Sequence, residues 1–164
     1  MSALKSGSKA PDVNLPLVGG GKFSLMDALS QGRVALAFFK ASCPVCQYAF
    51  PYFERFSQKL KSKGLRFVGV SQDNERDTVE FAKEFGVTFP IALDRPDRYP
   101  VSSAYGLTNV PTLFVLNGAG FIDHSIVSWS KSDMEALYKE FWDSATAGVP
   151  IFGAAEKVAD FKAG

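Results

Sequence analysis

The sequence is poor in the residue types and runs that mark several large classes of protein. It has one histidine, His124, and two cysteines, whereas a tetrahedral zinc site needs about four such ligands, so no complete zinc site is expected. Its 18 basic side chains are nearly balanced by 17 acidic ones without a basic block, so nucleic acid and membranes are not expected partners. No run approaches the roughly 20 apolar residues of a membrane span.

The N-terminal residues and the scarcity of cysteine also bear on the compartment. Residues 1–20 lack the apolar stretch of a secretory signal, so the chain as written is expected in the cytoplasm. Two cysteines close together do not form the disulfide framework of a secreted protein. In a reducing compartment such a pair is more often catalytic or metal-binding than structural.

The apolar runs that are present predict the strands of one α/β domain. At 164 residues the chain is long enough to bury a sizeable core. Apolar runs bounded by polar or glycine residues predict buried strands at 33–39, 65–70, 89–93 and 112–116. The Asn117-Gly118 pair predicts a hairpin after the last of these runs.

Helical patterns alternate with the predicted strands. From Cys46 to Leu60 apolar residues recur every three or four positions, and Gly64 closes the pattern. Further helices are predicted at 73–86, near 97–106 and after the capping box at 130–133. This order predicts a mostly parallel sheet that gains an antiparallel edge and is covered by helices on both faces.

The two cysteines lie in the stretch FFKASCPVC, directly after the first predicted strand. Cys43 falls at the start of the following helix, where unpaired N–H groups and the helix dipole favour a thiolate, so it is the predicted nucleophile. The spacing lets Cys46 approach Cys43 and close a disulfide, which makes Cys46 the predicted resolving thiol. Pro44 lacks an N–H and suits the opening of a helix. Half of a zinc site and an inert buried pair are the alternatives for a CxxC motif alone.

Four segments together carry a family resemblance. They are GSKAPDVNLP, FFKASCPVC, GVSQDNERDTVEFAKEFGVTFPIALD and AYGLTNVPTLFVLNGAGFI. From about Lys9 to Phe141 the chain resembles the thioredoxin superfamily, most closely its TlpA/ResA-like, AhpC/TSA-type redoxin branch. The resemblance implies a thioredoxin-like α/β fold with an N-terminal redoxin extension. We expect this domain at 1–146 and a C-terminal tail at 147–164, which has no regular pattern and is expected to lie on the surface or to fray.

The resemblance also implies site residues far from the two cysteines. Pro51 stands where the family carries a helix-kinking proline, which removes a hydrogen bond to the Gln47 carbonyl. Val110 and Pro111 resemble the family's loop in which a cis proline packs beside the cysteines and the preceding backbone pairs with a substrate strand. A cis peptide bond is therefore expected at Pro111.

Three residues close to Cys43 in sequence are also candidates. Ser42 and Pro44 flank the cysteine and are expected to contact substrate. Ser42 occupies the place where these oxidoreductases usually carry Trp, so the aromatic cover beside the nucleophile is missing. Lys40 is expected either to support the thiolate electrostatically or to be a solvated lysine at a strand end.

Two further departures concern proton transfer. Ala37 stands where thioredoxins keep a buried Asp, and Ala49 stands where some ResA-like members keep a Glu. No carboxylate is therefore expected to act as a proton relay for Cys46.

The function predicted from these residues is thiol-disulfide exchange through Cys43 and Cys46. The expected partners are a protein or small-molecule disulfide as substrate and a thiol as electron donor. The redox-active disulfide replaces any metal or organic cofactor, and the chain is expected to be a monomer or a weak dimer.

Two other functions are alternatives. A peroxiredoxin-like thiol peroxidase shares the fold, but its PxxxTxxC motif, aligned on Cys43, meets Leu36 and Lys40 at the Pro and Thr positions, with Ser42 as a possible substitute hydroxyl. A redox-sensing binding module without turnover is favoured by the missing acidic relay and the missing Trp.

Overall fold

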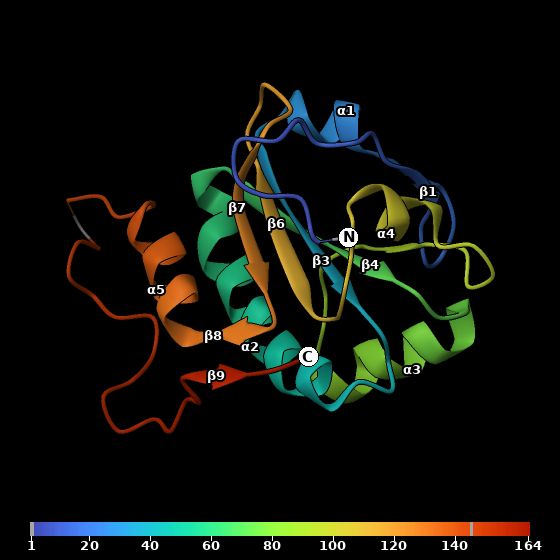
Figure 1. Ribbon diagram of the computed structural model, residues 1–164. Coiled ribbons are helices and arrows are strands. Elements are labelled where there is room, and N and C mark those ends of the chain that lie inside the picture. The colour runs from blue at the N-terminus through green and yellow to red at the C-terminus, as the bar shows by residue number, and fades with distance from the viewer. Residues whose placement is uncertain (1, 145) are drawn as a thin grey trace.

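The computed structural model describes residues 2–144 and 146–164, and its centre is a five-stranded sheet in the order β5-β4-β3-β6-β7 (Figure 1). The pairings β3–β4 and β4–β5 are parallel, while β3–β6 and β6–β7 are antiparallel. The strands are β3 (Arg33–Phe39), β4 (Leu65–Ser71), β5 (Ile91–Leu93), β6 (Thr112–Leu116) and β7 (Ile122–Val127). The predicted α/β class and mixed sheet are confirmed. The antiparallel part reaches further inward than the predicted edge, because β6 pairs directly with β3.

Alternating side chains of β3 supply both faces of the sheet with apolar surface. Ala35, Ala37 and Phe39 belong to the cluster formed with α2, α3 and α5, whereas Val34 and Leu36 belong to the cluster on the opposite face. This alternation follows from the two-residue period of a strand. The helices are α1 (Leu25–Leu29), α2 (Pro44–Leu60), α3 (Glu75–Phe85), α4 (Pro100–Ala104) and α5 (Lys131–Lys139), with a 3-10 turn η1 (Lys61–Lys63) after α2.

The N-terminal extension covers the face of the sheet opposite α2. It forms the hairpin β1 (Asn14–Pro16) and β2 (Lys22–Ser24), which pair antiparallel. Leu15 and Phe23 of this hairpin are buried in the same cluster as Leu36 of β3. The extension therefore completes the core on that face.

Local signals in the sequence set the limits of the longer helices. Asn74 and Ser130 each cap a helix by accepting a hydrogen bond from the backbone three residues ahead. Gly64 and Gly86 adopt left-handed backbone conformations that end η1 and α3. The last helix ends at Lys139, earlier than the apolar pattern predicts, because the chain continues into turns there.

The tail at 147–164 folds back onto the domain. Ile151 and Phe152 are buried, and the short strand β9 (Phe161–Lys162) pairs antiparallel with β8 (Trp129–Ser130). No strand is predicted for this segment from its sequence. The difference arises because the segment is ordered by contacts with α2 and β8 rather than by a pattern of its own.

Candidate active site

Cys43 lies at the junction between β3 and α2. A backbone hydrogen bond from Cys43 to the Lys40 carbonyl (3.2 Å) closes the turn that follows β3. Cys43 is the N-cap of α2, with an extended backbone, and its Sγ accepts a hydrogen bond from the Cys46 N–H at 3.3 Å. Pro44 is exposed in the first turn, where its missing N–H costs no helical hydrogen bond. The strand-to-helix placement predicted for the two cysteines is confirmed.

Cys46 has the opposite environment, although it lies only three residues away. Both cysteines are free, but Cys43 is half-buried while Cys46 is 0% exposed. Burial raises the pKa of the Cys46 thiol well above its usual range, and interactions with Cys43 and the negative charge of Asp73 add to the rise, while a backbone hydrogen bond with Lys40 opposes it. The pair thus combines an accessible sulfur with a protonated, enclosed one.

The loop before β6 completes the surroundings of Cys43. The Val110–Pro111 peptide bond is cis, as the resemblance implies. The Cys43 thiol donates a hydrogen bond to the Val110 carbonyl oxygen, with 3.5 Å between sulfur and oxygen. The loop is held by the Thr112 hydroxyl, which donates to the Asn109 carbonyl at 2.9 Å. Residues that are 67 positions apart in the chain therefore meet at one sulfur atom.

The other predicted site residues lie in the cysteine turn and along α2. Ser42 is exposed and lines a hollow beside α3. Pro51 lies inside α2 on its exposed side. The Lys40 ammonium lies 5.8 Å from the centre of the Tyr99 ring, which is a cation–π contact. The structure thus gives the Lys40 charge an aromatic partner.

Asp73 is a site residue that the sequence analysis missed. Its carboxylate accepts a hydrogen bond from the Ala41 N–H at 2.7 Å and so holds the turn that leads into Cys43. Asp73 follows β4 just as Ala41 follows β3, and neighbouring parallel strands end at the same edge of a sheet. The shared position after two adjacent strands is the signal that identifies it.

Side chains of α3 extend the acidic surface that begins at Asp73. They line a hollow of about 290 Å³ that reaches Ala41 and Ser42. Its carboxylates belong to Asp73, Asp77, Glu80 and Glu84. This surface gives one side of the cysteine pair a negative charge.

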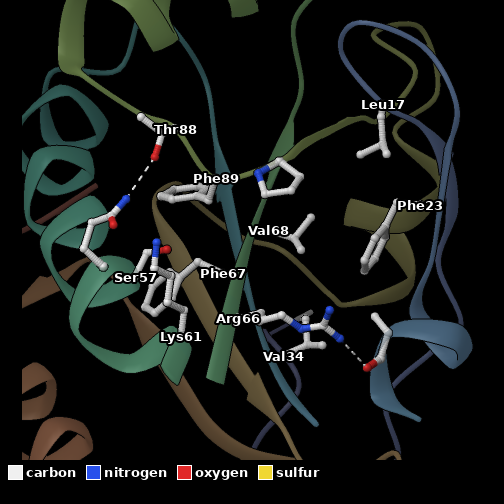
Figure 2. A pocket seen from close by; sticks show the side chains of 13 residues that line it. Leu17, Phe23, Val34, Ser57, Lys61, Arg66, Phe67, Val68, Thr88 and Phe89 are labelled. Atoms are coloured by element: carbon white, nitrogen blue, oxygen red, sulfur yellow. Dashed lines mark hydrogen bonds between the residues drawn. The ribbon is translucent and has the colours of Figure 1, made fainter. Parts of the chain in front are cut away.

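A second cavity, of about 390 Å³, lies away from the cysteines beside the first half of β4, before the residues that pair with β5 (Figure 2). Phe67 and Phe89 lie on one side of the strand, and Val68 and Phe23 lie on the other. None of the residues that line it belongs to the cysteine turn or to the cis-proline loop.

The described residues contain neither a metal-binding cluster nor a membrane-spanning helix. Within residues 2–144 and 146–164, no three His, Cys, Asp or Glu side chains are grouped to hold a metal ion. Over the same ranges, none of the helices has the length and apolar character needed to cross a membrane.

A CxxC pair at the start of a helix, beside a cis proline and on a mixed sheet, defines a thioredoxin-like dithiol protein. The Redoxin family model matches residues 5–141, and the chain belongs to the redoxin family. The thiol-disulfide oxidoreductase ResA of Geobacillus kaustophilus (strain HTA426) is 33% identical over 136 residues, which are 82% of this chain and 76% of that protein.

Solved structures agree with this assignment. A DsbE-type thiol:disulfide interchange protein from Chlorobium tepidum is 29% identical with a TM-score of 0.74, and the match covers 85% of this chain and 96% of that one. The thioredoxin domain of a Bacteroides vulgatus thiol-disulfide oxidoreductase, 24% identical with a TM-score of 0.76, shares the fold over 86% of this chain and 100% of its own. With its CxxC pair and these relatives, the chain is a thiol-disulfide oxidoreductase.

Proposed function

We propose that Cys43 attacks the substrate disulfide and that Cys46 resolves the intermediate. The observation that carries this assignment is the contrast in access, because Cys43 is half-buried at the N-cap of α2 while Cys46 is enclosed. The Cys46 N–H in the first helical turn points at the attacking sulfur, to which it donates a hydrogen bond at 3.3 Å. Its attack forms a bond to one substrate sulfur and breaks the substrate S–S bond, and the other substrate sulfur leaves as a thiolate that takes up a proton.

Cys46 then completes the exchange. After losing its proton, its sulfur attacks the Cys43 sulfur, the Cys43–Cys46 disulfide forms, and the second substrate sulfur leaves and is protonated. Two electrons have passed from the dithiol to the substrate, and a thiol electron donor returns them. Because burial raises the pKa of Cys46, this thiol stays protonated at first, which favours attack from Cys43.

The substrate class follows from the position of the Val110 carbonyl. It faces the Cys43 sulfur across 3.5 Å, so an extended segment paired with this backbone would present its disulfide to the nucleophile. Exposed Ser42 and Pro44 flank the same position without a bulky side chain. We therefore propose a protein disulfide as substrate. The two sulfur atoms carry both electrons, so the proposed exchange uses no metal or organic cofactor.

The test is to trap the intermediate with Cys46→Ser. This variant should form a covalent mixed disulfide with a disulfide-bonded peptide through Cys43, seen by mass spectrometry under non-reducing conditions. The matched variant Cys43→Ser should form none, because its remaining sulfur is enclosed. A mixed disulfide that forms through Cys46 instead would reverse the two roles, and trapping by neither variant would refute the mechanism.

Peroxide consumption distinguishes the exchange from peroxidase chemistry. At the two motif positions of a peroxidase, Leu36 is buried and apolar, and the Lys40 ammonium contacts Tyr99. Insulin reduction with dithiothreitol should therefore proceed faster than peroxide consumption with a thioredoxin system. The opposite ranking would favour peroxide as the substrate.

A further inference from the structure

The tail returns along α2 toward the cysteines. Glu156 forms a bidentate ion pair with Arg55 of α2, with N–O distances of 2.8 and 2.7 Å. Further along, the Ala159 N–H donates to the Tyr48 hydroxyl at 2.8 Å, and the Ala159 carbonyl accepts from the Trp129 indole N–H at 2.7 Å. These contacts direct the chain to the β8–β9 pair, and Figure 1 shows the red segment ending beside α2.

Ser128 joins the end of this segment to the cis-proline loop. Its hydroxyl accepts hydrogen bonds from the Gly164 N–H at 3.0 Å and from the Asn109 side-chain amide at 2.9 Å. Its own N–H donates to the Pro111 carbonyl at 2.8 Å. Ser128 has a φ of +70°, a strained conformation that persists where the surroundings fix it. One residue therefore holds the loop and the tail together.

Gly164 lies directly against the Val110 carbonyl. A Cβ added at position 164 would overlap the Val110 carbonyl oxygen, and it would lie 2.7 Å from the carbonyl carbon and 3.0 Å from the Asn109 amide nitrogen. The Val110 oxygen is also the atom that accepts the Cys43 thiol hydrogen bond. The tail thus occupies space on the backbone beside the nucleophile.

We propose that residues 161–164 form a strap that competes with the substrate for the backbone of Val110. This inference rests on the proposed function, in which an extended substrate segment pairs with that backbone. The strap and the substrate cannot both lie against one carbonyl, because even a single methyl group at position 164 finds no room there. Substrate binding displaces the strap. The smaller the fraction of protein in which the strap is already released, the weaker the apparent affinity for the substrate.

The hold on the strap is weak enough to be broken by a substrate. Phe161 is 61% exposed, and β8 and β9 pair over only two residues. Gly164 adds one hydrogen bond to Ser128, and the Lys162 ammonium lies 4.9 Å from the centre of the Tyr48 ring. By contrast, the root of the tail is fixed by buried Phe152 and by the ion pair of Arg55. The strap therefore opens at its end while the tail stays attached.

The first test adds one methyl group. Gly164→Ala should dislodge the strap and raise kcat/KM for a disulfide-bonded peptide about threefold, and removal of residues 162–164 should raise it up to about tenfold, through a lower KM. The control is Lys157→Ala, which changes an exposed side chain of the same tail and should leave kcat/KM unchanged. If the wild type is active and both strap variants have the same KM as the wild type, the proposed strap is refuted. A wild type that reduces no disulfide would instead overturn the proposed function.

The second test leaves the strap sequence intact. In Cys46→Ser, amide hydrogen exchange over residues 161–164 should be at least about threefold faster in the mixed disulfide with a peptide than in the free protein, since ordered substrate replaces the strap. Exchange over residues 151–156 should not change. Equal amide exchange rates at 161–164 in the two states would show that the substrate does not displace the strap, and would overturn the proposal.

Discussion

The two sides of the cysteine pair are held in different ways. On one side the α3 flank, which consists of Asp73, Asp77, Glu80 and Glu84, is an open acidic surface fixed to the cysteine turn by one carboxylate hydrogen bond. On the other side the tail flank, which consists of Tyr48, Tyr52, Trp129 and residues 151–160, packs through the aromatic rings of Tyr52, Trp129 and Phe152. Charge dominates the first flank, and apolar burial dominates the second.

Stability and reactivity are therefore separable between the two flanks. Substitutions in the tail flank remove buried area and should act mainly on the free energy of unfolding. Substitution of Asp73 in the α3 flank removes a charge that contributes to the raised pKa of Cys46, so it should act on the chemistry as well. Three changes test this contrast.

The largest effect is expected for Trp129→Ala. Trp129 is 0% exposed and stacks on Tyr52 with 5.1 Å between ring centres, so its loss opens a large cavity beneath the tail. The free energy of unfolding should fall by about 3–5 kcal/mol in urea titrations. Met26→Ala is the matched control, because Met26 is 71% exposed and should change stability by less than about 0.5 kcal/mol. A similar small loss in both variants would contradict the packed tail flank.

A smaller effect is expected for Asp73→Ala. The change leaves the Ala41 N–H without the acceptor that lies 2.7 Å away, and we expect a loss of about 1–2 kcal/mol in urea titrations. Asp73→Asn is the control, because it keeps an acceptor oxygen and should lose less. Both variants remove a charge that raises the pKa of Cys46, so alkylation of the remaining thiol in a Cys43→Ser background should speed up in both. Unchanged alkylation would show that Asp73 acts on structure alone.

The smallest effect is expected from the Glu156 ion pair as pH falls. The hydrogen bond from Arg55 holds the pKa of Glu156 at about 2, below its ordinary value of 4.5. A carboxyl whose pKa is lower in the folded protein contributes stability above its unfolded pKa and loses it as pH falls through the folded value. The thermal midpoint of wild type should therefore exceed that of Glu156→Gln at pH 7, and the gap should narrow between about pH 4.5 and pH 2. A gap that does not depend on pH would exclude the ion pair as its source.

Much of the fold was predictable because its signals are local. The predicted strands and helices recur in β3 to β6 and in α2 to α5, with the caps Asn74 and Ser130 in place. Cys43 follows a buried strand and precedes Pro44, so its position at the start of a helix is fixed by its neighbours. The cis bond at Pro111 was expected from the family resemblance rather than from any local pattern.

The missed residues share a different property. Asp73, Ser128 and Gly164 have no periodicity or motif that marks them, and each gains its role from a partner far away in the chain. No carboxylate relay for Cys46 is expected from the sequence, because Ala37 and Ala49 stand at the two positions where relatives carry one. The Asp73 carboxylate reaches the cysteine turn from the end of the neighbouring strand, 32 residues along the chain from Ala41.

Local patterns in the sequence specify most of the elements from β3 to α5, the dithiol and its place between a strand and a helix. Apolar periodicity, capping side chains and proline act within one or two turns of the backbone, so they can be read along the chain. Three features depend on contacts between distant segments: Cys46 is enclosed, Val110 faces Cys43, and Gly164 covers Val110. Those contacts join β3, the loop before β6 and the tail, and they exist because the sheet and its helices bring distant segments to one edge.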